Sequence, residues 1–213
     1  MKWLVYTMLV LCCAVSSLPA QEKIPFMFGD MDHWVVREIH ESAIIGGQTK
    51  YLYELGPVDT IVGNTAYKNR GNSPWANSNV MAKVAGIVKT NVSVFPEKRG
   101  EGWCARMETR MEKVKVLGLV DIEVVAAGSI FLGSVHEPIK GTKNPQSMLL
   151  SGLPFTKRPK ALQFDYKVKV MPQHTRVRST GFSRKGEVAG QDSVAVILLL
   201  QKRWEDKQGN VYS

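Results

Sequence analysis

The sequence predicts an all-β sandwich. Three observations carry this prediction: many short runs alternate apolar and polar residues, long polar turns separate these runs, and helix signatures are few. The chain has 213 residues, of which 44% are hydrophobic and 22% are charged. This is an ordinary globular balance, so we expect one domain, or one domain and part of another, with a buried core.

The first twenty residues are expected to form a secretory signal peptide rather than part of the fold. Lys2 gives a positive start, residues 3–15 are apolar, and residues 16–20 end in a small residue. The apolar run is shorter than the roughly 20 residues that a membrane span needs, which disfavours an uncleaved anchor. We therefore expect residues 21–213 to form the mature domain, secreted or held at the cell surface or in the periplasm, with no transmembrane segment.

The three cysteines raise two questions: whether the chain is a lipoprotein, and what role Cys104 has. Cys12 and Cys13 raise the possibility of a lipoprotein, but Val10 and Leu11 are larger than such a cleavage site prefers. After cleavage at residue 20 only Cys104 remains, and a single cysteine cannot form an internal disulfide. We expect Cys104 to be a small buried hydrophobic residue rather than a nucleophile.

The formal net charge is +9, or +8 once Lys2 leaves with the signal peptide. A basic chain can bind nucleic acid, but these basic residues are scattered and form only short clusters, at 157–160 and 167–178. A solvated basic face explains this pattern better, and secretion also argues against a nucleic-acid partner.

The first half of the mature chain contains short runs separated by polar loops. Residues 25–31 predict a short apolar strand, and residues 34–42 fit either a helix face or a strand. Residues 50–55 alternate around two tyrosines and predict a strand that ends at Gly-Pro. Residues 63–79 predict a long loop, of the kind that often carries function. Residues 84–95 predict one strand with a kink at a glycine.

The second half continues in the same way. Residues 103–111 alternate, with a row of alternating charge on one face. Residues 114–120 and 122–132 are apolar runs, expected at the centre of a sandwich or, as the weaker option, in a buried helix. Residues 136–160 predict a long proline-containing connection, and residues 161–171 predict a strand with apolar side chains at every second position.

Near its end the sequence predicts a buried strand over residues 193–200, a turn over residues 206–209 and the start of a new strand at residues 211–212. A domain rarely ends by opening a strand. We therefore expect that the sequence is cut short at residue 213.

Two tryptophans stand in or beside polar loops. Trp75 lies in a loop rich in Asn and Pro, and Trp103 begins a run just after a Gly-rich turn. Indole rings stack on the C–H faces of sugars, and Asn, Arg and Glu can hydrogen-bond to the hydroxyl groups. The alternative is that each indole covers one end of the core, which is what we expect for Trp34 and Trp204. The candidate carbohydrate-binding residues are Trp75, Asn77, Asn79, Glu101, Trp103 and Arg106.

Catalytic and metal chemistry receives little support from the sequence. Glycoside hydrolysis needs two carboxyl groups about 5 to 10 Å apart. Glu101 with Glu108, or Glu38 with Glu41, would be candidates, but neither spacing is diagnostic, so we assign no catalytic residue. The four histidines never occur at zinc-ligand spacing, and no nucleotide-binding or nucleophile motif is present. We expect no cofactor, although a structural calcium ion near residues 29–30 stays open.

Taken together, many stretches resemble one known family, the putative carbohydrate metabolism domain of secreted or surface bacterial proteins. The stretches are 28–30 (FGD), 34–39 (WVVREI), 41–42 (ES), 45–47 (IGG), 73–79 (SPWANSN), 115–118 (KVLG), 128–133 (GSIFLG), 137–139 (EPI), 154–155 (PF), 158–161 (RPKA), 164–167 (FDYK) and 200–206 (LQKRWED).

This resemblance covers nearly the whole mature chain and implies a jelly-roll-like β-sandwich similar to carbohydrate-binding modules. It supplies no catalytic residues. Family members continue past the last of these stretches, which agrees with a truncated sequence and with C-terminal strands that are missing from it.

We expect a carbohydrate-binding domain with a glycan as its ligand. The alternatives are a glycoside hydrolase or lyase on the same scaffold, and a structural or adhesin-type surface protein that binds no sugar. The sequence does not identify the glycan or the oligomeric state.

Overall fold

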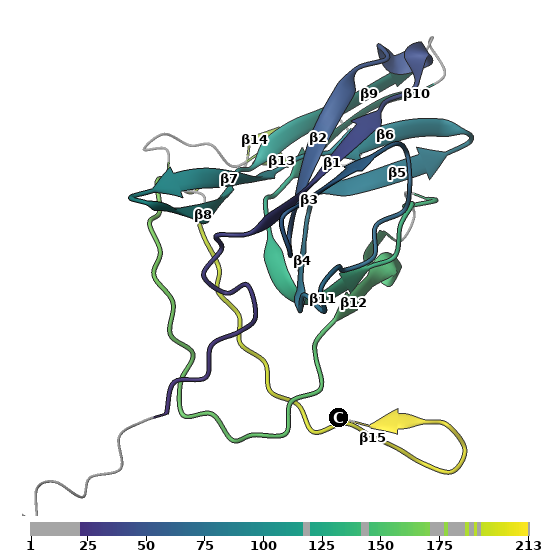
Figure 1. Ribbon diagram of the computed structural model, residues 1–213. Helices are drawn as coiled ribbons and strands as arrows, with labels where there is room; N and C mark the ends of the chain where they lie inside the picture. Colours follow the sequence, from purple (N-terminus) through teal and green to yellow (C-terminus); the bar gives the residue numbers. More distant parts are fainter. Residues whose placement is uncertain are drawn as a thin grey trace, which may run out of the picture.

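In the computed structural model, residues 22–116, 120–141, 145–170, 177–178, 186–187, 190 and 193–212 are described. Almost all regular structure is β, as predicted (Figure 1). The elements are β1 (Trp34–His40), η1 (Ala43–Ile45), β2 (Thr49–Leu55), β3 (Asp59–Val62), β4 (Trp75–Asn77), β5 (Val80–Val84), β6 (Ile87–Asn91), β7 (Val94–Arg99), β8 (Gly102–Met107), β9 (Arg110–Val116), β10 (Val120–Ala126), β11 (Ile130–Val135), η2 (Pro145–Met148), β12 (Leu149–Ser151), β13 (Val177–Arg178), β14 (Gly186–Glu187), β15 (Trp204–Glu205) and β16 (Val211–Tyr212).

The strands form several small sheets rather than one large one. Two sheets have three strands, in the orders β2-β1-β3 and β12-β11-β4, and the other pairings are β5-β6, β7-β8, β9-β10, β13-β14 and β15-β16. Within the first sheet, β1 is antiparallel to β2 and parallel to β3. The pair β1-β2 is the centre of the molecule because both of its faces carry buried side chains.

One face of the β1-β2 pair carries a first core cluster. Residues directly opposite one another share a face of a sheet, and Arg37 of β1 lies opposite Leu52 of β2. On this face Ile39 and Leu52 pack with Met81 of β5 and Val88 of β6. The hairpin β5-β6 therefore covers this side of the sheet.

The opposite face carries a second core cluster. Trp34 and Leu55 lie opposite each other in the register and pack with Val94 of β7. Tyr53 and Trp75 pack against the edge of this cluster. The hairpin β7-β8 thus contacts the body through Val94, Phe95 and Ala105, and its turn end projects from the other strands (Figure 1). We call the hairpin β7-β8 the arm.

Several predicted strands agree with the structure. Residues 50–55 lie in β2, and the ambiguous stretch 34–42 contains β1, which is a strand rather than a helix. Of the apolar runs between residues 114 and 132, residues 114–116 end β9, residues 120–126 form β10 and residues 130–132 begin β11, so the buried-helix option is wrong for these described residues. The predicted turn at 206–209 forms, because Gly209 N–H donates to Asp206 O, and it joins β15 to β16.

Two predictions in the first half are wrong. Residues 84–95 are not one strand, because a two-residue turn, Ala85-Gly86, reverses the chain between β5 and β6. Both turn residues have positive φ, 49° and 81°, as in the turns that suit the twist of a hairpin. Residues 25–31 form turns instead of a strand, with Gly29 N–H bonded to Phe26 O.

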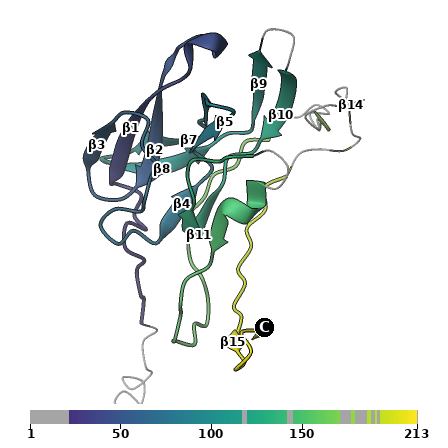
Figure 2. The same ribbon diagram turned by 90° about the vertical axis from the view of Figure 1, so that its right-hand side faces the viewer.

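Three predictions in the second half are also wrong. Residues 161–170 and 193–200 lie in no strand, although both are extended, and Figures 1 and 2 show them as traces outside the sheets. Trp204, expected in the core, is 53% exposed, whereas Trp34 is buried as expected. Residues 161–170 do alternate between apolar and polar side chains, but alternation alone does not supply a partner strand.

The proposed signal peptide, residues 1–20, lies outside the described residues. Within the described part of the chain, no helix has the length and apolar character needed to cross a membrane.

Candidate functional site

Arg37 is the centre of a buried charged cluster formed with Glu54 and Glu137. Its guanidinium lies on the inner face of β1, between Val35 and Ile39, and is fully buried. Nη1 donates to Glu54 Oε1 and to Glu137 Oε1, each at 3.0 Å, and Nη2 donates to Glu137 Oε2. A buried charge is tolerated only when it is paired and hydrogen-bonded, and here one cation faces two carboxyl groups.

Glu137 joins parts of the chain that are far apart in sequence. Besides Arg37, its carboxylate accepts hydrogen bonds from the backbone N–H of Tyr67 at 3.0 Å and of Met81 at 2.9 Å. Each of its oxygens thus has two donors. The residue fixes the loop that follows β11 against β1, β5 and the loop between β3 and β4.

Glu54 has a different environment on β2. Its Oε2 accepts from Asn77 Nδ2 at 3.0 Å, and its Oε1 accepts from Arg37. Burial raises the pKa of Glu54 to about 8, and the nearby Glu137 carboxylate adds to this, while Arg37 partly opposes it. Burial alone would lower the pKa of Arg37, but hydrogen bonds and charge attraction from Glu137 and Glu54 outweigh it, so that pKa is raised.

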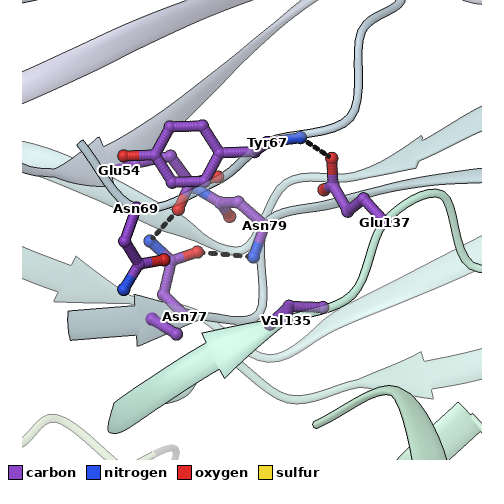
Figure 3. A pocket seen from close by; sticks show the side chains of 8 residues that line it. Glu54, Tyr67, Asn69, Asn77, Asn79, Val135 and Glu137 are labelled. Carbon is purple, nitrogen blue, oxygen red and sulfur yellow. Dashed lines mark hydrogen bonds between the residues drawn. The ribbon is translucent and has the colours of Figure 1, made fainter. Parts of the chain in front are cut away.

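A small cavity adjoins the cluster (Figure 3). Its volume is about 10 Å³, which is room for about one water molecule and far too little for a sugar ring. The lining residues are Glu54, Tyr67, Asn69, Ala76, Asn77, Asn79, Val135 and Glu137. Among the described residues the buried Tyr67 hydroxyl has no hydrogen-bond partner, and burial raises the pKa of Tyr67 to about 12. The cavity can hold one water molecule, and Glu54 can hold a proton. The hydrogen bonds of the charged cluster also join strands and loops that are far apart in the sequence.

Three of the sequence candidates lie at or just after β4, and two of them, Asn77 and Asn79, line this cavity. Asn77 donates to Tyr53 O at 2.8 Å, and Asn79 donates to Tyr53 O at 2.9 Å and to Val94 O at 2.8 Å. Both asparagines are buried. The Trp75 indole N–H donates to Met27 O at 2.8 Å. These side chains therefore bind other parts of the same chain, and sugar contact by them stays a prediction.

The other three candidates lie on the arm. Glu101 is exposed in the turn between β7 and β8, and its carbonyl accepts from Lys98 Nζ at 3.0 Å. Asp32 Oδ1 accepts a hydrogen bond from the Trp103 backbone N–H at 2.6 Å, which holds the start of β8 in place. The indole of Trp103 is 36% exposed, and Lys98 Nζ lies 4.6 Å from its ring centroid.

Arg106 lies on the opposite face of the arm from Trp103, as the alternation along the strand predicts. It is opposite Phe95 in the register, and its guanidinium carbon is 4.7 Å from the centroid of that ring. Arg106 also pairs with Glu97, at 2.9 Å, and with Glu108. Its charge is therefore already balanced by two carboxylates.

The structure thus divides the six candidates into two groups. In the first group, in and after β4, the two asparagines are buried and Trp75 is half-buried against the second core cluster. The second group is carried by the arm. Glu101 and Trp103 lie close together in the arm's sequence, whereas Arg106 faces the other side. Trp75 packs against the second core cluster, whereas Trp103 lies on the arm beneath Lys98.

Two of the carboxylates considered from the sequence, Glu108 and Glu41, are bound by separate groups of partners. Glu108 pairs with Arg106 and Arg110 at the surface. Glu41 is buried and accepts the backbone and hydroxyl hydrogens of Thr90, at 2.9 and 2.8 Å. Near the calcium position considered above, Asp30 Oδ1 accepts from Asp32 N–H. Over the described ranges, no group of three or more His, Cys, Asp or Glu side chains could hold a metal ion.

Sequence reasoning missed Arg37, Glu54, Tyr67 and Glu137. A signal for Arg37 was present, because it shares a strand face with Val35 and Ile39, and a charged residue in phase with apolar neighbours indicates a buried pair. Glu54 shares a face with Leu52 in the same way. No local pattern identified Glu137, which acts from a loop 100 positions away from Arg37.

The strand architecture and this arrangement define an all-β domain with a buried charged brace and a projecting arm of aromatic and charged residues. The chain belongs to the family described as putative carbohydrate metabolism domain, whose model matches residues 56–211, most of the chain. The resemblance inferred from the sequence is confirmed. No curated protein and no solved structure matches the chain. β1 and β2 precede the matched range, so Arg37 and Glu54 lie outside it and Glu137 lies inside it.

Proposed function

We propose that this domain is secreted or displayed at the cell surface and binds carbohydrate through its arm, with Trp103 as the ring that stacks on the sugar. The observation that carries the proposal is the exposed indole of Trp103 on a hairpin that projects from the sheets. The family name supports a role in carbohydrate metabolism. A flat aromatic ring with a polar surround is the usual way to bind the apolar face of a sugar while pairing its hydroxyl groups.

The side chains around Trp103 suit that task. Glu101 in the turn supplies an exposed carboxylate, which accepts hydrogen bonds from hydroxyl groups. Lys98 holds its ammonium over the indole and supplies a donor. Arg106, on the other face, would contact only a glycan long enough to pass around the edge of the arm. We therefore assign the first contacts to Trp103 and Glu101.

The proposal is tested by calorimetry of the full chain against a panel of neutral and acidic oligosaccharides. For any glycan that binds, Trp103→Ala is expected to weaken affinity by about 30-fold, or about 2 kcal/mol, as for an aromatic hot spot. Trp204→Ala is the matched control, because Trp204 is also exposed but lies on β15, and it should leave affinity unchanged.

Two results would contradict the proposal. One is a bound glycan whose affinity is the same in the Trp103→Ala variant, which would move the site away from the arm. The other is an absence of binding across the panel together with a protein partner in pull-downs, which would favour the structural or adhesin-type alternative. Release of reducing sugar in the same samples would instead favour the hydrolase alternative.

A further inference from the structure

Two extended segments, residues 161–170 and 193–200, expose a large amount of apolar surface. Their chain directions are opposite in Figure 1, where the first runs upward and the second downward. The exposed apolar side chains range from 38% to 85% exposure. They are Leu162, Phe164, Tyr166, Val168, Val170, Val194, Val196, Ile197, Leu198, Leu199 and Leu200.

The first segment has the side-chain pattern of a strand with one apolar face. Its even-numbered residues are all apolar, and its odd-numbered residues between 163 and 169 are Gln, Asp, Lys and Lys. The second segment is apolar at both even and odd positions and contains no charge, Pro or Gly. Such sequences are stable in water only when their backbone groups and apolar faces find partners.

A short hairpin between the two segments gives the register in which they would meet. In β13-β14, Val177 pairs with Glu187 and Arg178 pairs with Gly186, so the two numbers in each pair add up to 364. An antiparallel ladder keeps this total constant along its length. Continued outwards, the same register places Val170 opposite Val194. The further pairs are Val168 with Val196, Tyr166 with Leu198, and Phe164 with Leu200.

Both segments lie in no strand of the structure. We propose that in solution residues 161–170 and 193–200 pair with each other as an antiparallel β-ribbon in the register of β13-β14. Every even-numbered side chain of both segments then lies on one face, and that face is apolar throughout. The odd-numbered face carries Asp165, whose Oδ2 already lies 4.0 Å from Arg99 Nη1 at the end of β7. The ribbon would therefore lie beside the arm.

Pairing within one chain is favoured over pairing between chains. The hairpin β13-β14 lies between the two segments in the chain and already closes part of the loop that joins them, so less loop-closure entropy opposes the ribbon. The family match extends through residue 211, and both segments therefore belong to the domain. Cross-strand contacts between apolar residues and the ladder hydrogen bonds both stabilise the paired state.

Cysteine cross-linking tests the register directly. In the full chain with Cys12, Cys13 and Cys104 changed to serine, the pair Gln163→Cys and Gln201→Cys satisfies the total of 364. Air oxidation with a copper catalyst is expected to give about tenfold more intramolecular disulfide for this pair than for Lys157→Cys with Gln201→Cys, because that control pair is six positions out of register and exceeds disulfide reach. All three positions are exposed.

Hydrogen exchange of the unaltered chain gives an independent reading that needs no variant. Amides in residues 161–170 and 193–200 are expected to exchange about tenfold more slowly than those in residues 153–160, which are also exposed and also lie in no strand. Equal exchange in all three segments would overturn the ribbon. Equal cross-linking of the two cysteine pairs, or disulfides found only between chains, would also overturn it.

Discussion

At the scale of single residues, Glu54 and Arg37 show how a charge is accommodated inside a β domain. Arg37 faces two carboxyl groups, and with Glu54 protonated near neutral pH the cluster has one positive and one negative charge. Removing one partner of such a cluster leaves a buried charge without compensation. The proton on Glu54 therefore balances the charge of the cluster.

This proton makes the stability depend on pH. Unfolded Glu54 ionises near its ordinary pKa of 4.5, and folded Glu54 ionises near 8. Between these values the folded state keeps a proton that the unfolded state has lost, so the free energy of unfolding falls as pH rises, by at most about 1.4 kcal/mol per pH unit. In Glu54→Gln this contribution to the fall should be absent.

Urea unfolding at several pH values between about 5 and 9 measures this slope. Glu101→Gln, at an exposed turn position, is the control and should keep the slope of the unaltered protein. A Glu54→Gln variant with the same slope as the unaltered protein would show that Glu54 does not retain its proton in the folded state.

At the scale of elements, turns decide where strands end. The turn between β5 and β6 has Ala85 at φ 49°, in the left-handed region that Cβ-bearing residues other than Asn and Asp disfavour. Gly86, at φ 81°, adopts such a conformation without strain. The sequence indicated a break at this glycine but not a reversal, because Ala-Gly is a weaker hairpin signal than Asn-Gly.

Ala85→Asn should stabilise the protein by about 0.5–1 kcal/mol, because Asn tolerates the left-handed conformation better than Ala. Ala85→Val should have the opposite effect, since a β-branched residue fits this conformation poorly. Thermal unfolding of the three proteins measures both changes. A lower melting temperature for Ala85→Asn would contradict the assigned turn.

At the scale of the whole molecule, the two core clusters lie on opposite faces of β1-β2. Leu52 and Val94 belong to different clusters. Leu52→Ala should cost about 2–5 kcal/mol, since it leaves a cavity in a buried site. Val94→Ala should cost less because fewer atoms are removed. The two losses should add to within about 0.5 kcal/mol in the double variant, since the sites share no partner.

Denaturant unfolding of the two single variants and the double variant measures the additivity. Leu52→Ala combined with Val88→Ala is the comparison, because both residues belong to the first cluster and should couple. Strong coupling between Leu52 and Val94 would mean that the two clusters form one continuous core.

The features that the sequence predicted well are local ones. The alternation around Tyr51 and Tyr53 located β2, and the alternation after Trp103 placed Trp103 and Arg106 on opposite faces of β8. The burial of Asn77 was not predictable, because it depends on a carboxylate of another strand. A polar loop composition indicates exposure, but these amides instead pair with backbone groups that the fold brings to them.

The failures at longer range have the same physical origin. The pattern of residues 161–170 is that of a strand, yet whether a strand forms depends on a partner far along the chain. The same is true of Arg37, because its strand pattern indicates burial but only the fold brings its partner Glu137 beside it. Membership of the family, in contrast, was recognisable from many short stretches in a given order along the chain. Recognising them requires no knowledge of which residues meet in three dimensions.

The bond between Arg37 and Glu137 also has a consequence for how fast the protein folds and unfolds. The two residues lie 100 positions apart, so their pairing requires most of the chain between them to be in place first. We expect this contact to be absent from the folding transition state. Glu137→Gln should then raise the unfolding rate by about 100-fold, the equivalent of about 3 kcal/mol, while the refolding rate stays nearly unchanged. Stopped-flow kinetics would show this as a shift of the unfolding limb of the chevron plot alone. The charged cluster would then determine how long the native state persists before it unfolds.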